Sequence, residues 1–164
     1  MNFSLNAADL DPGQGQWWSR LPWGTVSGAL SAEAAAEWEE ERPAHASGRF
    51  YARLTGGTLT LNKKIFPEFP PAAIESGELE AVIGDGALTL TLGRFTGPDF
   101  TLNLDGGATL TPSPVFSRLN LKGTLKLSPK LEKGLGVFAG ALPKAAGGAR
   151  SFTLTGTLAR PILR

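Results

Sequence analysis

The sequence predicts a mainly β protein: a curved antiparallel sheet, or an open barrel-like meander, with one or two short helices. The chain has 21 glycines and 12 prolines, which are unfavourable inside helices. Many short segments alternate leucine with threonine or another polar residue, as half-buried strands do. A Gly–small–Leu pattern recurs at residues 57–61, 86–88, 123–127 and 156–158. Strands that each begin at a glycine turn are typical of sequential hairpins.

Composition limits the number of domains and the class of partner. With 164 residues, 41% of them hydrophobic, the chain is long enough for one domain with a core but short for two, so residues 1–164 are interpreted as a single domain. The net charge of +1 argues against nucleic acid, which needs a concentrated basic surface. The absence of cysteine excludes disulfides and thiolate chemistry.

The first strand is predicted at the amino terminus, where Phe3, Leu5 and Ala7 alternate with polar residues. Residues 11–24, DPGQGQWWSRLPWG, interrupt the alternation with proline and glycine and predict a loop.

Residues 25–41, TVSGALSAEAAAEWEEE, fit either a strand or a helix. Alanine and glutamate favour a helix, whereas one parity of positions is apolar or small throughout, which favours a strand. Because glycine-started strands surround this segment, we predict a strand over residues 25–31. Residues 32–40 stay open between strand and helix.

The middle of the chain predicts strands separated by glycine turns. Residues 49–54 place apolar side chains on one parity, which flips at Gly56-Gly57 and predicts a tight turn or bulge there. Residues 62–73, NKKIFPEFPPAA, predict a loop. Residues 76–93 predict a hairpin that turns at Gly84-Asp85-Gly86.

A short helix over residues 72–83 is the competing interpretation of the first arm of that hairpin. The second arm is expected to put Leu88, Leu90 and Leu92 on one face.

The last third predicts further strands and a helix. Phe100, Leu102 and Leu104 alternate before an expected Asp-Gly-Gly turn at residues 105–107, and residues 119–127 give the most regular alternation.

A helix is predicted around residues 129–142, with Ser128 as its cap and Pro129 at its first position. A final strand is expected over residues 152–158.

No catalytic or metal-binding constellation is visible, so the sequence predicts neither an enzyme nor a cofactor. His45 is the only histidine and lies in a predicted loop; one histidine without cysteine excludes the usual zinc ligands. The acidic run at residues 37–41 is interpreted as a solvated strand end. Asp85 and Asp105 are interpreted as turn residues.

A curved antiparallel sheet with one apolar face must cover that face with a helix, a partner or a ligand. We favour an ordinary core closed by the helix of residues 131–142, because a small domain needs its apolar area for stability. The alternative is a groove for acyl chains or an apolar partner segment. The predicted positions on this face are Leu30, Trp38, Phe50, Leu54, Leu90, Leu92, Phe100, Leu102 and Leu104.

Aromatic residues cluster in two of the predicted loops, and for both the choice lies between packing inside the protein and contact with a membrane surface, where tryptophan is enriched. We favour packing, because aromatic side chains usually bury. The candidate membrane-proximal residues are Trp17, Trp18, Trp23, Phe66 and Phe69.

Two stretches carry a resemblance to a known family. Residues 77–129 read G-x-L-x-A-x-I-x-D-G-x-L-x-L, then G-x-D-F-x-L-x-L-D-G, LTPSP and SRLNLKGTLKLSP, and the chain closes with SFTLTGTLARPIL. This pattern resembles the type II secretion system protein N family, which is related to the AsmA-like proteins. The closing Gly-x-Leu-x-x-Pro strand is its most telling part.

The resemblance implies a non-enzymatic, β-rich periplasmic domain of a Gram-negative inner-membrane protein that contacts other secretion-system proteins. The AsmA-like relatives imply the alternative of lipid binding: a curved sheet whose apolar concave face takes phospholipid or acyl chains in envelope lipid transport or homeostasis. Members carry one amino-terminal transmembrane helix. Since this sequence shows neither such a helix nor a signal peptide, we expect the anchor to be missing from this chain.

Overall fold

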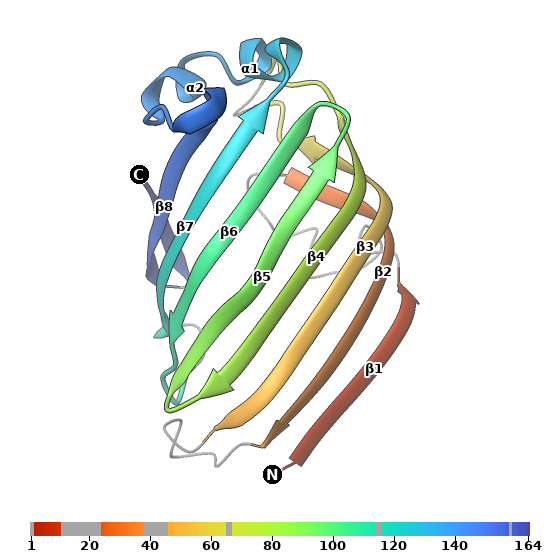
Figure 1. Ribbon diagram of the computed structural model, residues 1–164, viewed down its shortest axis with the longest axis vertical. Coiled ribbons are helices and arrows are strands. Elements are labelled where there is room, and N and C mark those ends of the chain that lie inside the picture. Colours follow the sequence, from red (N-terminus) through yellow and green to blue (C-terminus); the bar gives the residue numbers. More distant parts are fainter. Residues whose placement is uncertain (1, 11–23, 38–45, 65–66, 114–115, 158) are drawn as a thin grey trace.

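A computed structural model of the chain describes residues 2–10, 24–37, 46–64, 67–113, 116–157 and 159–164. Within these residues, nine strands form one antiparallel sheet in which each strand pairs with the next along the chain (Figure 1). The sheet is curved and does not close, so β1 and β9 are its edges. The predicted fold class, a curved antiparallel meander, is confirmed.

The sheet consists of β1 (Asn2–Leu10), β2 (Gly24–Glu37), β3 (Ser47–Leu61), β4 (Ala72–Gly84), β5 (Ala87–Gly97), β6 (Phe100–Thr109), β7 (Arg118–Leu127), β8 (Arg150–Thr157) and β9 (Arg160–Leu163). The helices α1 (Pro129–Leu135) and α2 (Val137–Ala141) and the short 3₁₀ turn η5 (Ala146–Gly148) lie between β7 and β8. Figure 1 shows α1 and α2 at one end of the sheet, which we call the helical end.

The segment left open between strand and helix is a strand as far as Glu37, where the described part of it ends. The alanines of this segment favour a helix when considered alone, but their small size suits the neighbouring strand, and this packing favours the strand. Ala34 lies opposite Phe50, and Ala36 lies opposite Gly48. A small side chain therefore meets a glycine or leaves room for an aromatic ring of the neighbouring strand.

Two expectations about the β3–β4 region are resolved by strand pairing. The parity flip at Gly56-Gly57 is a bulge, because β3 continues through it with Gly56 at φ 61°. The alternative helix over residues 72–83 is wrong. This segment is β4, and its backbone pairs with both β3 and β5.

The two predicted Asp-Gly turns have different outcomes. The turn at residues 84–86 is confirmed: Asp85 and Gly86 have φ values of 50° and 72°, the left-handed pair of a type I′ hairpin. The turn at residues 105–107 is wrong, because β6 runs straight through it. There the glycines permit close strand approach, since a Cβ on Gly107 would collide with the Leu88 carbonyl oxygen.

The predicted helix is present but is divided in two at Gly136, where φ is 55°. The start is as predicted: the Oγ of Ser128 accepts a hydrogen bond from the Leu131 backbone N–H at 3.4 Å, and Pro129 is the first helical residue. The break keeps α1 and α2 short, so both depend on packing against the sheet.

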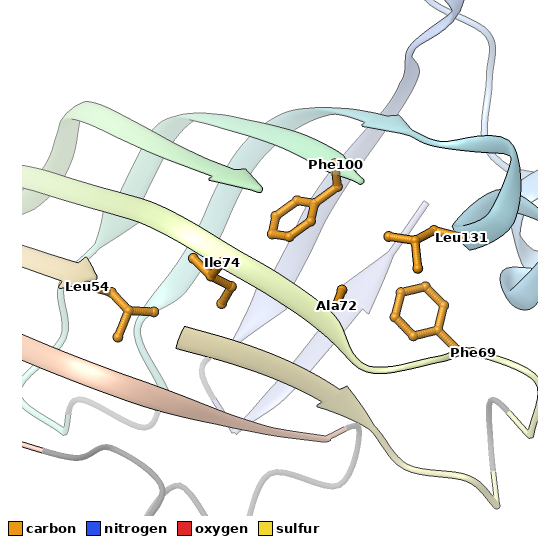
Figure 2. Close-up of a cluster of buried hydrophobic side chains, with 6 residues drawn as sticks. All are labelled: Leu54, Phe69, Ala72, Ile74, Phe100 and Leu131. Carbon is orange, nitrogen blue, oxygen red and sulfur yellow. The ribbon is translucent and has the colours of Figure 1, made fainter. Parts of the chain in front are cut away.

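The core lies toward the helical end of the sheet. A loop before β4 and helix α1 each contribute one large side chain to it, Phe69 and Leu131, which are 6% and 1% exposed (Figure 2). Of the two interpretations offered for Phe69, the structure therefore shows packing in the core. The complete buried cluster is Leu54, Phe69, Ala72, Ile74, Phe100 and Leu131.

Among the residues that the structure describes, no helix is long and apolar enough to cross a membrane.

Candidate functional site

The two faces of the sheet differ sharply in chemistry. We call the face that carries the core cluster the inner face. Strand register places Phe95 opposite Leu102 and Leu102 opposite Leu125, which gives an apolar row across three strands. Along the described strands β2–β9, Arg150 is the only charged residue at an inner-face position.

Near the helical end, the inner face forms a groove of about 520 Å³. This volume falls within the roughly 300–1,000 Å³ of typical small-molecule sites. Strands of both halves of the sheet form its floor, and α2 with the end of α1 borders it. The residues that line the groove are Leu59, Leu61, Phe69, Ala72, Phe100, Leu102, Leu125, Leu127, Leu135, Phe138, Ala141, Leu142, Phe152, Leu163 and Arg164.

Two glycine–phenylalanine pairs shape the inner face. Gly77 lies opposite Phe95, and Gly123 lies opposite Phe152. In both pairs the aromatic ring covers the glycine so closely that a Cβ there would overlap ring atoms. The missing side chains leave room for both rings over the neighbouring strands, and Phe152 lines the groove.

Arg150 is largely buried beside the groove, and its charge is satisfied inside the protein. Its side chain is 17% exposed, and its Nη2 lies 2.6 Å from Oε1 of Glu132 on α1. Its Nη1 donates to the Leu142 carbonyl oxygen at 3.4 Å, just after α2. A buried guanidinium is tolerable with such partners, and here they join β8 to both ends of the helical segment.

The opposite, outer face is polar, and its ion pair is a surface pair. Nη2 of Arg53 lies 2.7 Å from Oε1 of Glu78, with side chains 55% and 34% exposed. The hydrogen bond from Arg53 to Glu78, with a smaller effect of Tyr51, raises the pKa of the Arg53 guanidinium above its ordinary value.

Most predicted inner-face residues lie where they were expected. Phe100 and Leu102 line the groove, and Leu54 belongs to the core cluster. The inner face also holds the predicted residues Leu30, Phe50, Leu90 and Leu104.

The prediction for Leu92 is wrong. A register shift between β4 and β5 places it opposite Glu80 on the outer face, where it is 36% exposed. An irregularity inside a strand reverses the parity of every residue after it.

Several candidates lie outside the described residues: Trp38 of the predicted inner face, His45, and the aromatic residues Trp17, Trp18, Trp23 and Phe66.

Sequence reasoning missed part of the groove. Leu125 and Leu127 were recognised as strand residues but were not assigned to the groove, although their alternation with lysine was the available signal. The contributions of α2 and the pairing of Arg150 with Glu132 carry no sequence signal, because they depend on how the helical segment folds back over β8.

The described part of the chain contains no group of three or more metal-ligating side chains. No protein-family model, curated protein or solved structure matches this chain at a significant level.

Proposed function

We propose that this chain is a non-enzymatic binding domain whose groove holds the acyl chain of a lipid. The observation that carries the proposal is the apolar groove itself, a space bordered mainly by leucine and phenylalanine side chains from five strands and two helices. Burial of apolar surface contributes about 25 cal/mol per Å², so a chain of methylene groups gains binding energy along such a groove without any polar partner.

An acyl chain fits this groove better than an extended peptide. A peptide carries one N–H and one C=O group per residue, and each is costly to bury without a partner. The floor strands use their backbone groups to pair with one another. The only charged inner-face side chain of the described strands, Arg150, is already paired.

The inner face is open at the groove, where apolar side chains of the floor strands stay accessible. An open sheet that leaves apolar area uncovered gains stability from any ligand that binds the folded state alone.

The resemblance to AsmA-like proteins gives this binding a cellular context. We propose that the ligand is a phospholipid or its acyl chain in the envelope of a Gram-negative bacterium. The domain would then act in the periplasm in envelope lipid transport or homeostasis.

The test compares two substitutions at neighbouring positions of β6. Leu102→Glu places a carboxylate in the groove, whereas Asn103→Glu places it on the outer face. Binding is measured by displacement of a fluorescent fatty acid, together with native mass spectrometry of protein from a lipid-rich lysate. We expect Leu102→Glu to weaken binding at least tenfold and Asn103→Glu to leave it unchanged. Equal affinities, or no bound acyl lipid in any sample, would refute the proposal.

A second candidate function is a type II secretion accessory role through contact with other secretion-system proteins. The asymmetry of the sheet edges favours it: β1 is nine residues long, whereas β9 has four residues and contains Pro161. Proline blunts an edge, while a long edge strand can accept a partner strand. Hydrogen exchange of β1 with purified secretion-system components is the test, and absence of protection in β1 would count against it.

A further inference from the structure

The described connections between strands are basic at the helical end of the sheet. Connections at this end follow β3, β5 and β7, and Arg164 follows β9 there. They contain two pairs of lysines, one after β3 and one on α1, and two further basic residues after α2 and β9. We call these six residues the basic rim: Lys63, Lys64, Lys130, Lys133, Lys144 and Arg164.

Acidic residues do not balance this charge within the described part of the chain. The carboxylates of the same connections are Glu68, Asp99 and Glu132, and Glu132 is already paired with Arg150. All six residues of the basic rim are exposed, and none forms an ion pair with a described residue. At the opposite end of the sheet, the described connections contain one charged residue, Asp85. Positive charge is therefore concentrated at the helical end.

The segments that carry the basic rim lie together. A Cβ on Gly134 of α1 would press on the backbone of Glu68 and Phe69. The connection after β3 therefore lies against α1, the helix that carries Lys130 and Lys133. Figure 1 shows α2 at the same end of the sheet. The charges of the rim thus come from separate segments of the chain but share one end of the molecule.

The basic rim adjoins the groove and exposed apolar side chains. Arg164 lines the groove and directly follows Leu163, a second lining residue that is 58% exposed. Phe138 on α2 also lines the groove and is 47% exposed. Cations beside exposed apolar groups are typical of surfaces that bind the lipid–water interface, where the apolar groups enter the headgroup region and the cations attract anionic headgroups. Nucleic acid fits less well, because its phosphates would use the cations and leave the apolar groups in water.

We propose that the helical end docks on an anionic lipid bilayer through the basic rim. Docking places the groove next to the membrane surface, where an acyl chain can pass between bilayer and groove. That transfer rests on the acyl-chain function proposed above, whereas the docking itself rests on the distribution of charge and of exposed apolar side chains.

Vesicle flotation tests the docking with the whole chain and two vesicle compositions. One is phosphatidylcholine alone, and the other contains about one-third phosphatidylglycerol as the anionic lipid. Lys130→Gln/Lys133→Gln removes two charges of the basic rim. Arg49→Gln/Arg118→Gln is the matched control, because it removes two exposed cations near the opposite end, where β3 and β7 begin.

Wild-type protein should bind the anionic vesicles, should not bind phosphatidylcholine alone, and should be released by high salt, which screens such contacts. Lys130→Gln/Lys133→Gln should weaken binding about ten- to thirtyfold, at about fivefold for each lysine near the surface. The control should change binding less than about twofold, because its charges lie far beyond the range of screening from the rim. Lys63→Gln/Lys64→Gln should weaken binding as the α1 variant does, and this excludes a purely local effect on α1.

Failure to bind anionic vesicles, equal binding to both vesicle types, or an equal loss in the control would overturn the docking. Binding of a free fluorescent fatty acid, measured without vesicles, separates this proposal from the acyl-chain function. Vesicle binding without fatty-acid binding supports the docking and refutes the acyl-chain function, whereas fatty-acid binding without vesicle binding refutes the docking alone.

Discussion

Alanine substitutions at three glycines test whether close backbone packing shapes this sheet. A Cβ on Gly107 would collide with the backbone carbonyl oxygen of Leu88, which cannot move without separating β5 from β6. A Cβ on Gly123 would overlap the ring of Phe152, which can rotate away. A Cβ on Gly84 would meet nothing within 4 Å.

The three variants should therefore fall in a fixed order of stability. Overpacking costs about 1–3 kcal/mol, and we place Gly107→Ala at or above the upper value and Gly123→Ala near the lower value. Gly84→Ala should be neutral or stabilise by up to about 1 kcal/mol, because it restricts the unfolded chain.

Urea unfolding gives the free energies directly. Thermal unfolding should follow at about 2–4 °C per kcal/mol for a chain of this size. A second measurement separates the two collisions: adding Phe152→Leu should recover part of the loss in Gly123→Ala and none of the loss in Gly107→Ala. If the three glycine variants are equally stable, or if Gly123→Ala is the least stable of them, close packing at these glycines is not what limits the sheet.

Three further substitutions test the core, the helix start and the outer face. Leu131→Ala should lower the free energy of unfolding by about 2–5 kcal/mol in urea titrations, because it empties a site that is 1% exposed; a loss below 1 kcal/mol would contradict its place in the core. Ser128→Ala should cost about 0.5–2 kcal/mol by the same method, since it removes the cap of α1, and an unchanged midpoint would contradict that role. Breaking the exposed Arg53–Glu78 pair with Glu78→Gln should leave the urea midpoint essentially unchanged, because solvent screens a surface ion pair, and a clear loss of stability would show that the outer face contributes more than its exposure implies.

Alternation was sufficient to predict most of the strands, because the inner face repeats with period two over long stretches. Residues 119–127 and the Asp85-Gly86 turn follow local rules that one sequence segment obeys by itself. The alanine-rich part of β2 required tertiary context, since Ala34 and Ala36 are small to suit Phe50 and Gly48 of the neighbouring strand. No local propensity reports such a pairing.

The errors have two physical origins: glycine has several uses in a sheet, and strand register can shift inside a strand. At residues 105–107 glycine was interpreted as a turn, but it permits close approach inside β6. At Leu92 a register irregularity reversed the expected face. Only part of the groove could be predicted from the sequence. Alternating leucines indicated its floor, whereas Arg150 and the segment around α2 come together only through tertiary folding.

The most direct test of the account is to locate a bound acyl chain. A fatty acid with a diazirine near its terminal methyl is bound to the protein and photolysed, and the labelled residues are identified by mass spectrometry. If the groove holds an acyl chain, groove residues such as Leu102, Leu125 and Phe138 should be labelled, and unlabelled fatty acid should displace the probe. Labelling confined to the outer face, or labelling that excess fatty acid does not displace, would contradict it.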